Sequence, residues 1–167
     1  MALGMYAATV PLLKQLLTGL SNNLDKAAAF AEAKKVDPLV LTASRLAPDM
    51  FALARQVQIA SDQARGGIAR LAGVDMPSWA DTETTIDELK ERIAKTIAYI
   101  DSFTPAQIDG SEDRDITLKM RAGELKFTGA NYLTQWIIPN FTFHCTTAYA
   151  ILRHNGVEIG KRDFLGM

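Results

Sequence analysis

The stretch TGANYLTQWIIPNFTFHCTTAYAILRHNG, residues 128–156, decides the fold. Its apolar residues recur every three or four positions and therefore share one face of a helix: Phe141, Cys145, Ala148 and Leu152. Gly156 follows this run, and Arg153 and His154 lie in the final turn, where cations suit the helix dipole. The pattern predicts a helix with one buried face, kinked or broken near Pro139 because proline lacks a backbone donor.

The same stretch holds both histidines of the chain, His144 and His154, and its one cysteine, Cys145. The histidines are ten residues apart, which separates their Cα atoms by about 15 Å along an ideal helix. They therefore cannot share one metal ion on a straight helix. Cys145 points about 100° away from His144 around the helix axis, so we interpret it as a core residue rather than half of a thiolate–imidazole pair.

The composition is that of a soluble globular protein, with 167 residues, 48% apolar residues, 22% charged residues and a net charge of −1. We expect a single domain over residues 1–167. The balanced charge, without any basic run, argues against a nucleic-acid partner. A single cysteine fits the reducing cytoplasm, and the apolar runs are too short or too polar for a membrane span. We therefore expect a cytoplasmic protein without a membrane partner.

Residues 3–34 predict a first long helix, in which leucines and alanines form one apolar stripe and Pro11 marks either a kink or the true start. A second long helix is expected to open at Pro48, because a proline costs no hydrogen bond in the first turn, and to stop at Gly73. Its expected inner face consists of Phe51, Ala54, Val57, Gln58, Ser61, Ala64, Ile68 and Leu71.

Thr85 and Glu88 fit a capping box, which predicts a third helix running to about Ser102. Residues 116–127 then alternate between apolar and polar types around a glycine, which predicts a small β-hairpin. The tail EIGKRDFLGM, residues 158–167, is expected to be extended. Together these patterns indicate an all-α protein, a four-helix bundle with a small β-hairpin inserted before the last helix.

Three phrases carry a resemblance to a known family: RLAPDMFALARQVQIASDQARG at 45–66, DTETTIDELKERI at 81–93 and PNFTFHCTTAYAILRHNGVEIGKRDF at 139–164. They are similar to an uncharacterised bacterial family of DinB/YfiT-like four-helix-bundle proteins, over nearly the whole chain. The resemblance implies the same DinB-like bundle.

Many members of that superfamily bind a divalent metal through three histidines, one on the second helix and two on the fourth in a pattern like H-x-x-x-H-R-G-Q. The residues HNGV at 154–157 resemble the end of this pattern, but Ala150 stands where the earlier histidine would be. The second helix offers only Gln56 and Gln58, and an amide oxygen replaces imidazole poorly at zinc or nickel. We expect no cofactor; the alternative is a zinc or nickel site that keeps His154 as a relic ligand.

Several polar residues lie on faces that should be apolar: Gln56, Gln58, Asn140, His144 and Thr147. Buried polar groups must be hydrogen-bonded, so these residues either close a structural network or line a small pocket between two helices. Tyr149 would stand at the mouth of such a pocket.

Three hypotheses about function follow. The first is a metal-free module that binds a small molecule or serves in assembly. The second is a divergent metal-dependent transferase or hydrolase with a reduced site around His144 and His154. The third is a homodimer that associates through a bundle face or through the hairpin, which an excess of exposed apolar surface would favour.

Overall fold

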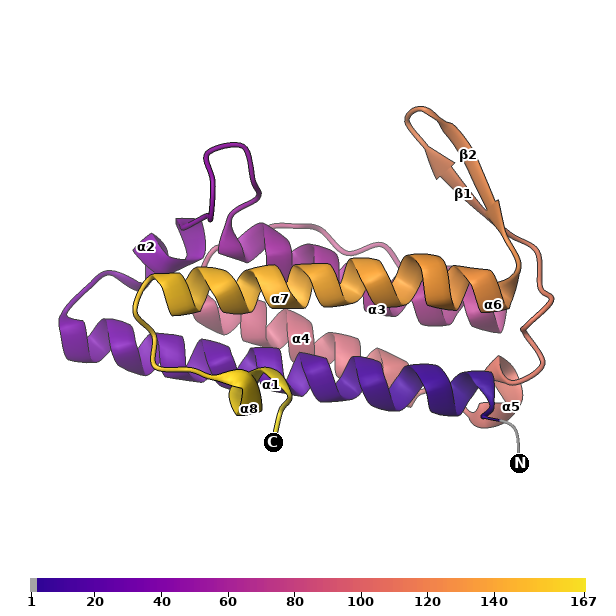
Figure 1. Ribbon diagram of the computed structural model, residues 1–167, viewed down its shortest axis with the longest axis horizontal. Coiled ribbons are helices and arrows are strands. Elements are labelled where there is room, and N and C mark those ends of the chain that lie inside the picture. The colour runs from indigo at the N-terminus through magenta and orange to yellow at the C-terminus, as the bar shows by residue number, and fades with distance from the viewer. Residues whose placement is uncertain (1–2) are drawn as a thin grey trace.

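The computed structural model describes residues 3–167, in which four long helices pack side by side and a hairpin projects from one end (Figure 1). The long helices are α1 (Met5–Lys34), α3 (Leu53–Ala72), α4 (Ile86–Asp101) and α7 (Ile138–His154). The shorter elements are α2 (Pro38–Ala43), α5 (Pro105–Ile108), β1 (Ile116–Met120), β2 (Gly123–Phe127), α6 (Gly129–Asn131) and α8 (Lys161–Phe164). This architecture confirms the predicted bundle with a hairpin before the last helix.

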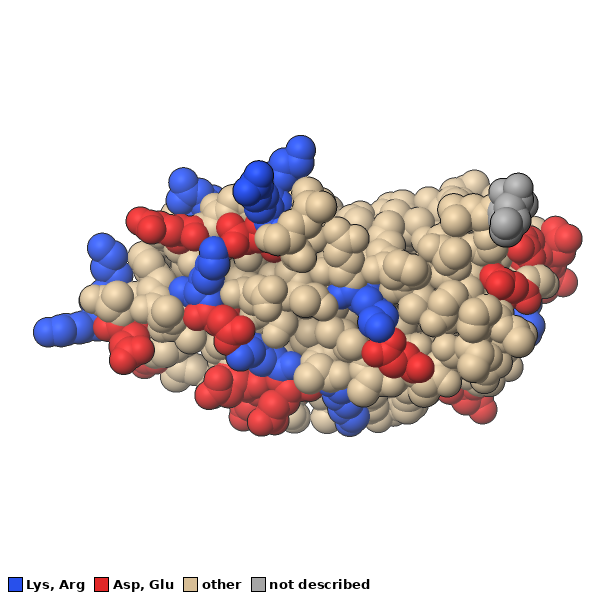
Figure 2. All heavy atoms as spheres, turned by 90° about the horizontal axis from the view of Figure 1, so that it is seen from below, with Lys and Arg blue, Asp and Glu red and all other residues tan. Residues whose placement is uncertain are grey.

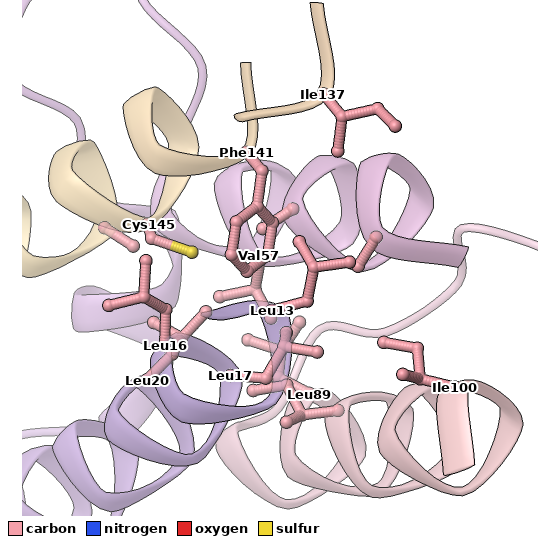
Figure 3. Close-up of a cluster of buried hydrophobic side chains, with 14 of the residues drawn as sticks. Leu13, Leu16, Leu17, Leu20, Val57, Leu89, Ile100, Ile137, Phe141 and Cys145 are labelled. Atoms are coloured by element: carbon pink, nitrogen blue, oxygen red, sulfur yellow. The ribbon is translucent and has the colours of Figure 1, made fainter. Parts of the chain in front are cut away.

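The core lies where the apolar stripes of the four long helices meet (Figure 3). Phe141 and Cys145 of α7 point into it, toward leucines of α1 and Val57 of α3. All four residues of the predicted α7 stripe are at most 2% exposed. Since full burial of a large apolar side chain stabilises the fold by about 1.5–3 kcal/mol, this stripe anchors α7 in the bundle.

The irregularity expected near Pro139 is a wide π-helical turn, η1 (Tyr132–Ile137), directly before α7. Pro139 lies in the first turn of α7, where its missing N–H is tolerated. Ile137 packs closely on α3 at Gly67: a Cβ at that glycine would lie 2.9 Å from Ile137 Cδ1. A larger residue at Gly67 would push α7 away from α3.

Two details of the predicted elements are wrong, the start of the second long helix and the extended tail. The second long helix, α3, begins at Leu53 and not at Pro48, because residues 45–52 form a loop. Phe51, expected on the inner face, is consequently 56% exposed. The first helix was predicted over residues 3–34, and α1 begins at Met5, so Pro11 lies inside it and is not its start. The tail is not wholly extended, since α8 forms a short turn in which the Gly160 N–H donates to Asp163 Oδ2 over 2.7 Å.

Arg92 of α4 holds the connector between α3 and α4, residues 73–85. Its Nη1 donates to Ala80 O over 3.0 Å and to Glu83 Oε1 over 2.9 Å. Its Nη2 donates to Asp62 Oδ1 and Asp81 Oδ1, each over 2.8 Å. The Arg92 side chain is only 1% exposed. One buried guanidinium therefore joins α3, α4 and the connector.

Arg65 of α3 supports the same connector through an aromatic contact. Its Nη2 donates to Asp62 Oδ1 over 2.7 Å, and its Cζ lies 3.9 Å from the ring centroid of Trp79. Within residues 3–167, Arg65 Nε and Nη1 have no hydrogen-bond partner. The ring face of Trp79 offsets part of that loss through a cation–π interaction.

Acidic and basic side chains are intermixed on the face of the molecule in Figure 2, which shows no continuous basic surface. Several of them pair across elements, as Lys26 does with Asp163 over 2.5 Å. Within residues 3–167, no helix combines the length and the apolar character that crossing a membrane requires.

The substitution Arg92→Met should lower the free energy of unfolding by about 3 kcal/mol, because it leaves partly buried carboxylates without their partner. The control is Lys90→Met, which removes the ion pair between Lys90 and Asp25. The side chains of Lys90 and Asp25 are 32% and 56% exposed. That exposed pair should contribute less than about 1 kcal/mol. Urea unfolding of the two variants measures the difference. Equal losses would show that the Arg92 network does not hold the connector.

Candidate functional site

Gln56 of α3 and His144 of α7 meet between their two helices. Gln56 Oε1 lies 2.7 Å from His144 Nδ1. The amide nitrogen of Gln56 donates to the Phe51 carbonyl over 3.0 Å, so its oxygen is the atom that accepts from the imidazole. Nδ1 therefore carries a proton. In the neutral imidazole, Nε2 is then an unprotonated hydrogen-bond acceptor.

The surroundings of His144 favour this neutral form. Burial, and secondly the positive charge of Arg55, lower the pKa of His144 below its ordinary value. Phe143 packs edge-on against the imidazole, with ring centroids 5.2 Å apart. Within the part of the chain that the structure describes, Gln56 is the one protein group that hydrogen-bonds this side chain. Nε2 therefore has no hydrogen-bond partner among these residues.

A hollow of about 450 Å³ lies between the loop 45–52 and α7. We call it the α7 groove; it is lined by Leu46, Met50, Pro139, Thr142, Phe143, Thr146, Thr147 and Ala150. His144 is not one of these lining residues, but it directly follows Phe143 and lies one helical turn before Thr147. The volume is within the usual range for small-molecule sites, and the lining is mainly apolar, as such sites usually are.

The residues in this groove do not fit the metal centre of the superfamily. Ala150, at the position where the resemblance places a histidine ligand, presents a methyl group, and its neighbours in the groove include Leu46 and Met50. His154 is exposed at the end of α7. Over residues 3–167, no group of three or more His, Cys, Asp or Glu side chains is arranged to hold a metal ion.

Gln58, predicted to share a pocket with His144, lies on another face of α3. Its oxygen accepts from Arg55 Nη1 over 3.2 Å, and its nitrogen donates to Glu83 Oε2 over 3.1 Å. Two positions along a helix differ by about 200° around its axis, so Gln56 and Gln58 cannot face the same neighbour. Gln58 belongs to the polar contacts of the connector.

The remaining predicted pocket residues are spread along α7. Asn140 donates to the Trp136 carbonyl, and Thr147 donates to the Phe143 carbonyl, each over 2.8 Å within the helix. Thr147 also lines the groove. Tyr149 packs against Phe164 of α8, with ring centroids 5.8 Å apart, and is not part of the groove mouth.

The sequence reasoning missed the loop side of the groove, because it placed residues 48–52 in a helix. The chain instead makes a β-turn in which the Met50 N–H donates to the Ala47 carbonyl over 3.0 Å. Pro48 and Asp49 are its central residues, and Pro-Asp is a favoured pair at these positions. That dipeptide was the signal for a turn.

The lowered pKa of His144 predicts a loss of stability on acidification. The unfolded chain, with a histidine pKa of about 6.5, binds the proton more readily than the folded chain, so stability falls as the pH drops through that value. His144→Gln should reduce the pH dependence of the urea midpoint between about pH 7.5 and 5.5. The exposed control, His154→Gln, should leave that dependence unchanged.

The most perturbed carboxylate titrates outside this window. Hydrogen bonds from the Thr84 and Thr85 backbone lower the pKa of Glu88 to about 2, so the stability linked to it is lost only below about pH 4.5. A midpoint that rises on acidification, or a slope unchanged by His144→Gln, would contradict the assigned neutral imidazole.

Comparison with known proteins places this chain and its fold in a family. The family model described as "Domain of unknown function (DUF1993)" matches residues 5–165. The crystal structure of a DinB family member protein from Shewanella denitrificans is 46% identical, with a TM-score of 0.89, over 97% of this chain and 92% of that chain. Among curated proteins, none matches this chain. The chain belongs to the DUF1993 family of DinB-like helical bundles, as the three phrases of its sequence indicated.

Proposed function

We propose that this protein binds a small molecule in the α7 groove, beside His144, and does so without a metal. One observation carries the proposal: His144, whose Nε2 has no hydrogen-bond partner within residues 3–167, directly follows Phe143 of the apolar hollow along α7. The hollow includes Ala150, the position at which the superfamily pattern would have a metal ligand. An oriented hydrogen-bond acceptor here takes the place of a metal.

The groove selects for a ligand with an apolar body and one hydrogen-bond donor. Leu46, Met50 and Phe143 provide contacts to the apolar part. A hydroxyl or amide N–H of the ligand donates to His144 Nε2. Because Arg55 is close enough to lower the pKa of His144, its positive charge disfavours a cationic ligand.

The alternative, a metal-dependent transferase or hydrolase, has less support. Its metal would need donor atoms where Ala150, Leu46 and Met50 supply carbon or a weak thioether. We also infer that the protein works in the cytoplasm, because its one cysteine, Cys145, is a buried free thiol, as is usual in a reducing compartment.

Benzyl alcohol and toluene are matched probes, since they share a ring and differ in one hydroxyl group. Both should perturb the NMR signals of the α7 groove in the wild-type protein. His144→Phe should lower the preference for benzyl alcohol over toluene by about two- to tenfold, the equivalent of one hydrogen bond. Titration of backbone amide shifts measures both affinities.

Ala150→Trp provides the control for location, because a large side chain at this position fills the hollow and should abolish binding of both probes. Two results would contradict the proposal. One is that neither probe shifts groove residues in the wild-type protein. The other is that His144→Phe leaves the ratio of the two affinities unchanged.

A further inference from the structure

Two parts of the chain project from the same side of the bundle, at opposite ends (Figure 1). One is the loop 45–52 between α2 and α3; the other is the β1–β2 hairpin. The helix α7 runs between their bases. The face so formed has a raised element at each end.

The hairpin has one charged and one apolar face. Its register pairs Lys119 with Glu124 and Leu118 with Leu125. On the apolar face, Leu118 is buried against the bundle, whereas Leu125 and Met120 near the turn are 40% and 46% exposed. The apolar face therefore extends past the bundle to an uncovered end, which we call the hairpin tip (Met120 and Leu125).

The other end of the same face is apolar as well. Phe51 and Phe143 are 56% and 55% exposed, and Leu46 is 40% exposed. Two half-exposed phenylalanines leave about 200 Å² of apolar surface open. A standard interface buries about 800 Å² on each partner, of which about 450 Å² is apolar. The groove rim alone falls short of this area, but the rim and the hairpin tip together approach it.

We propose that a second copy of this chain docks on this face, with the hairpin tip of each copy against the α7 groove rim of the other. A two-fold axis between the two ends exchanges them, so the tip-to-groove contact forms twice and the assembly closes as a dimer. Such a contact covers Leu125 and Phe143, two of the exposed apolar side chains of residues 3–167. The dimer and the proposed ligand share Leu46 and Phe143 of the groove, so the dimer is tested with no ligand present.

Analytical ultracentrifugation without any ligand tests the dimer, so this result is separate from the result of the probe titrations. The wild-type protein should sediment as a dimer, at twice its 18.3 kDa. Leu125→Glu and Phe143→Lys should each give a monomer. An equimolar mixture of the two should restore a dimer, because one contact then joins opposite charges and the other contact is unchanged.

Thr117→Glu is the matched control, because it adds the same charge to the same hairpin on the charged face, where Thr117 pairs with Lys126. This variant should remain dimeric, and circular dichroism shows whether each variant is folded. A monomeric wild-type protein, a dimer that survives Leu125→Glu, or a mixture that stays monomeric would each overturn the proposed arrangement.

Discussion

The packing of α7 on α3 is the contact on which the rest of this structure depends. The two helices run antiparallel, and Gln56 of α3 contacts His144 of α7 over 2.7 Å. Farther along α3, Gly67 packs against Ile137 and Arg70 donates to Tyr132 over 3.2 Å, both in the turn η1 that leads into α7. This register places the loop before α3 beside α7, where the groove runs from Pro139 to Ala150. The groove exists because that loop covers α7 without filling the space beside Ala150.

Within this interface, Gln56 provides the hydrogen-bond partner that the half-buried imidazole of His144 requires. A buried donor without a partner would cost about 1–3 kcal/mol, and Gln56 Oε1 accepts from Nδ1 while its own nitrogen is satisfied by the Phe51 carbonyl. The same arrangement turns Nε2 away from any protein partner. The pairing with Gln56 thus leaves a hydrogen-bond acceptor on the residue that follows Phe143 of the groove.

Short-range patterns predicted most of the fold. The α7 stripe, the alternation in the hairpin and the Thr85–Glu88 capping box each depend on residues a few positions apart, and all three are present. Pro48 misled the prediction because it suits both the first turn of a helix and the second position of a β-turn. Longer-range contacts favour the turn, since the Leu53 N–H donates to the Ser44 carbonyl over 2.9 Å and closes the loop.

The candidate site was only partly predictable. Gln56 and His144 were identified as polar residues on apolar faces. They are 88 residues apart in sequence, and their pairing depends on how α3 and α7 are aligned, which no local pattern reveals. Helical geometry alone places Gln56 and Gln58 on different faces of α3, so their separation could have been predicted from the sequence. The Arg65 and Arg92 contacts with the connector involve partners in an irregular segment, which no periodicity reveals.

The most direct test is to determine which nitrogen of the His144 imidazole carries the proton and whether Zn²⁺ binds to it. Long-range ¹H–¹⁵N NMR of the imidazoles, with and without Zn²⁺, measures both. We expect a protonated Nδ1 and an unprotonated Nε2 at neutral pH, with His144 signals that Zn²⁺ leaves in place. A proton on Nε2 in the neutral ring, or a stoichiometric Zn²⁺ shift of the His144 signals, would contradict the metal-free acceptor and favour a metal site.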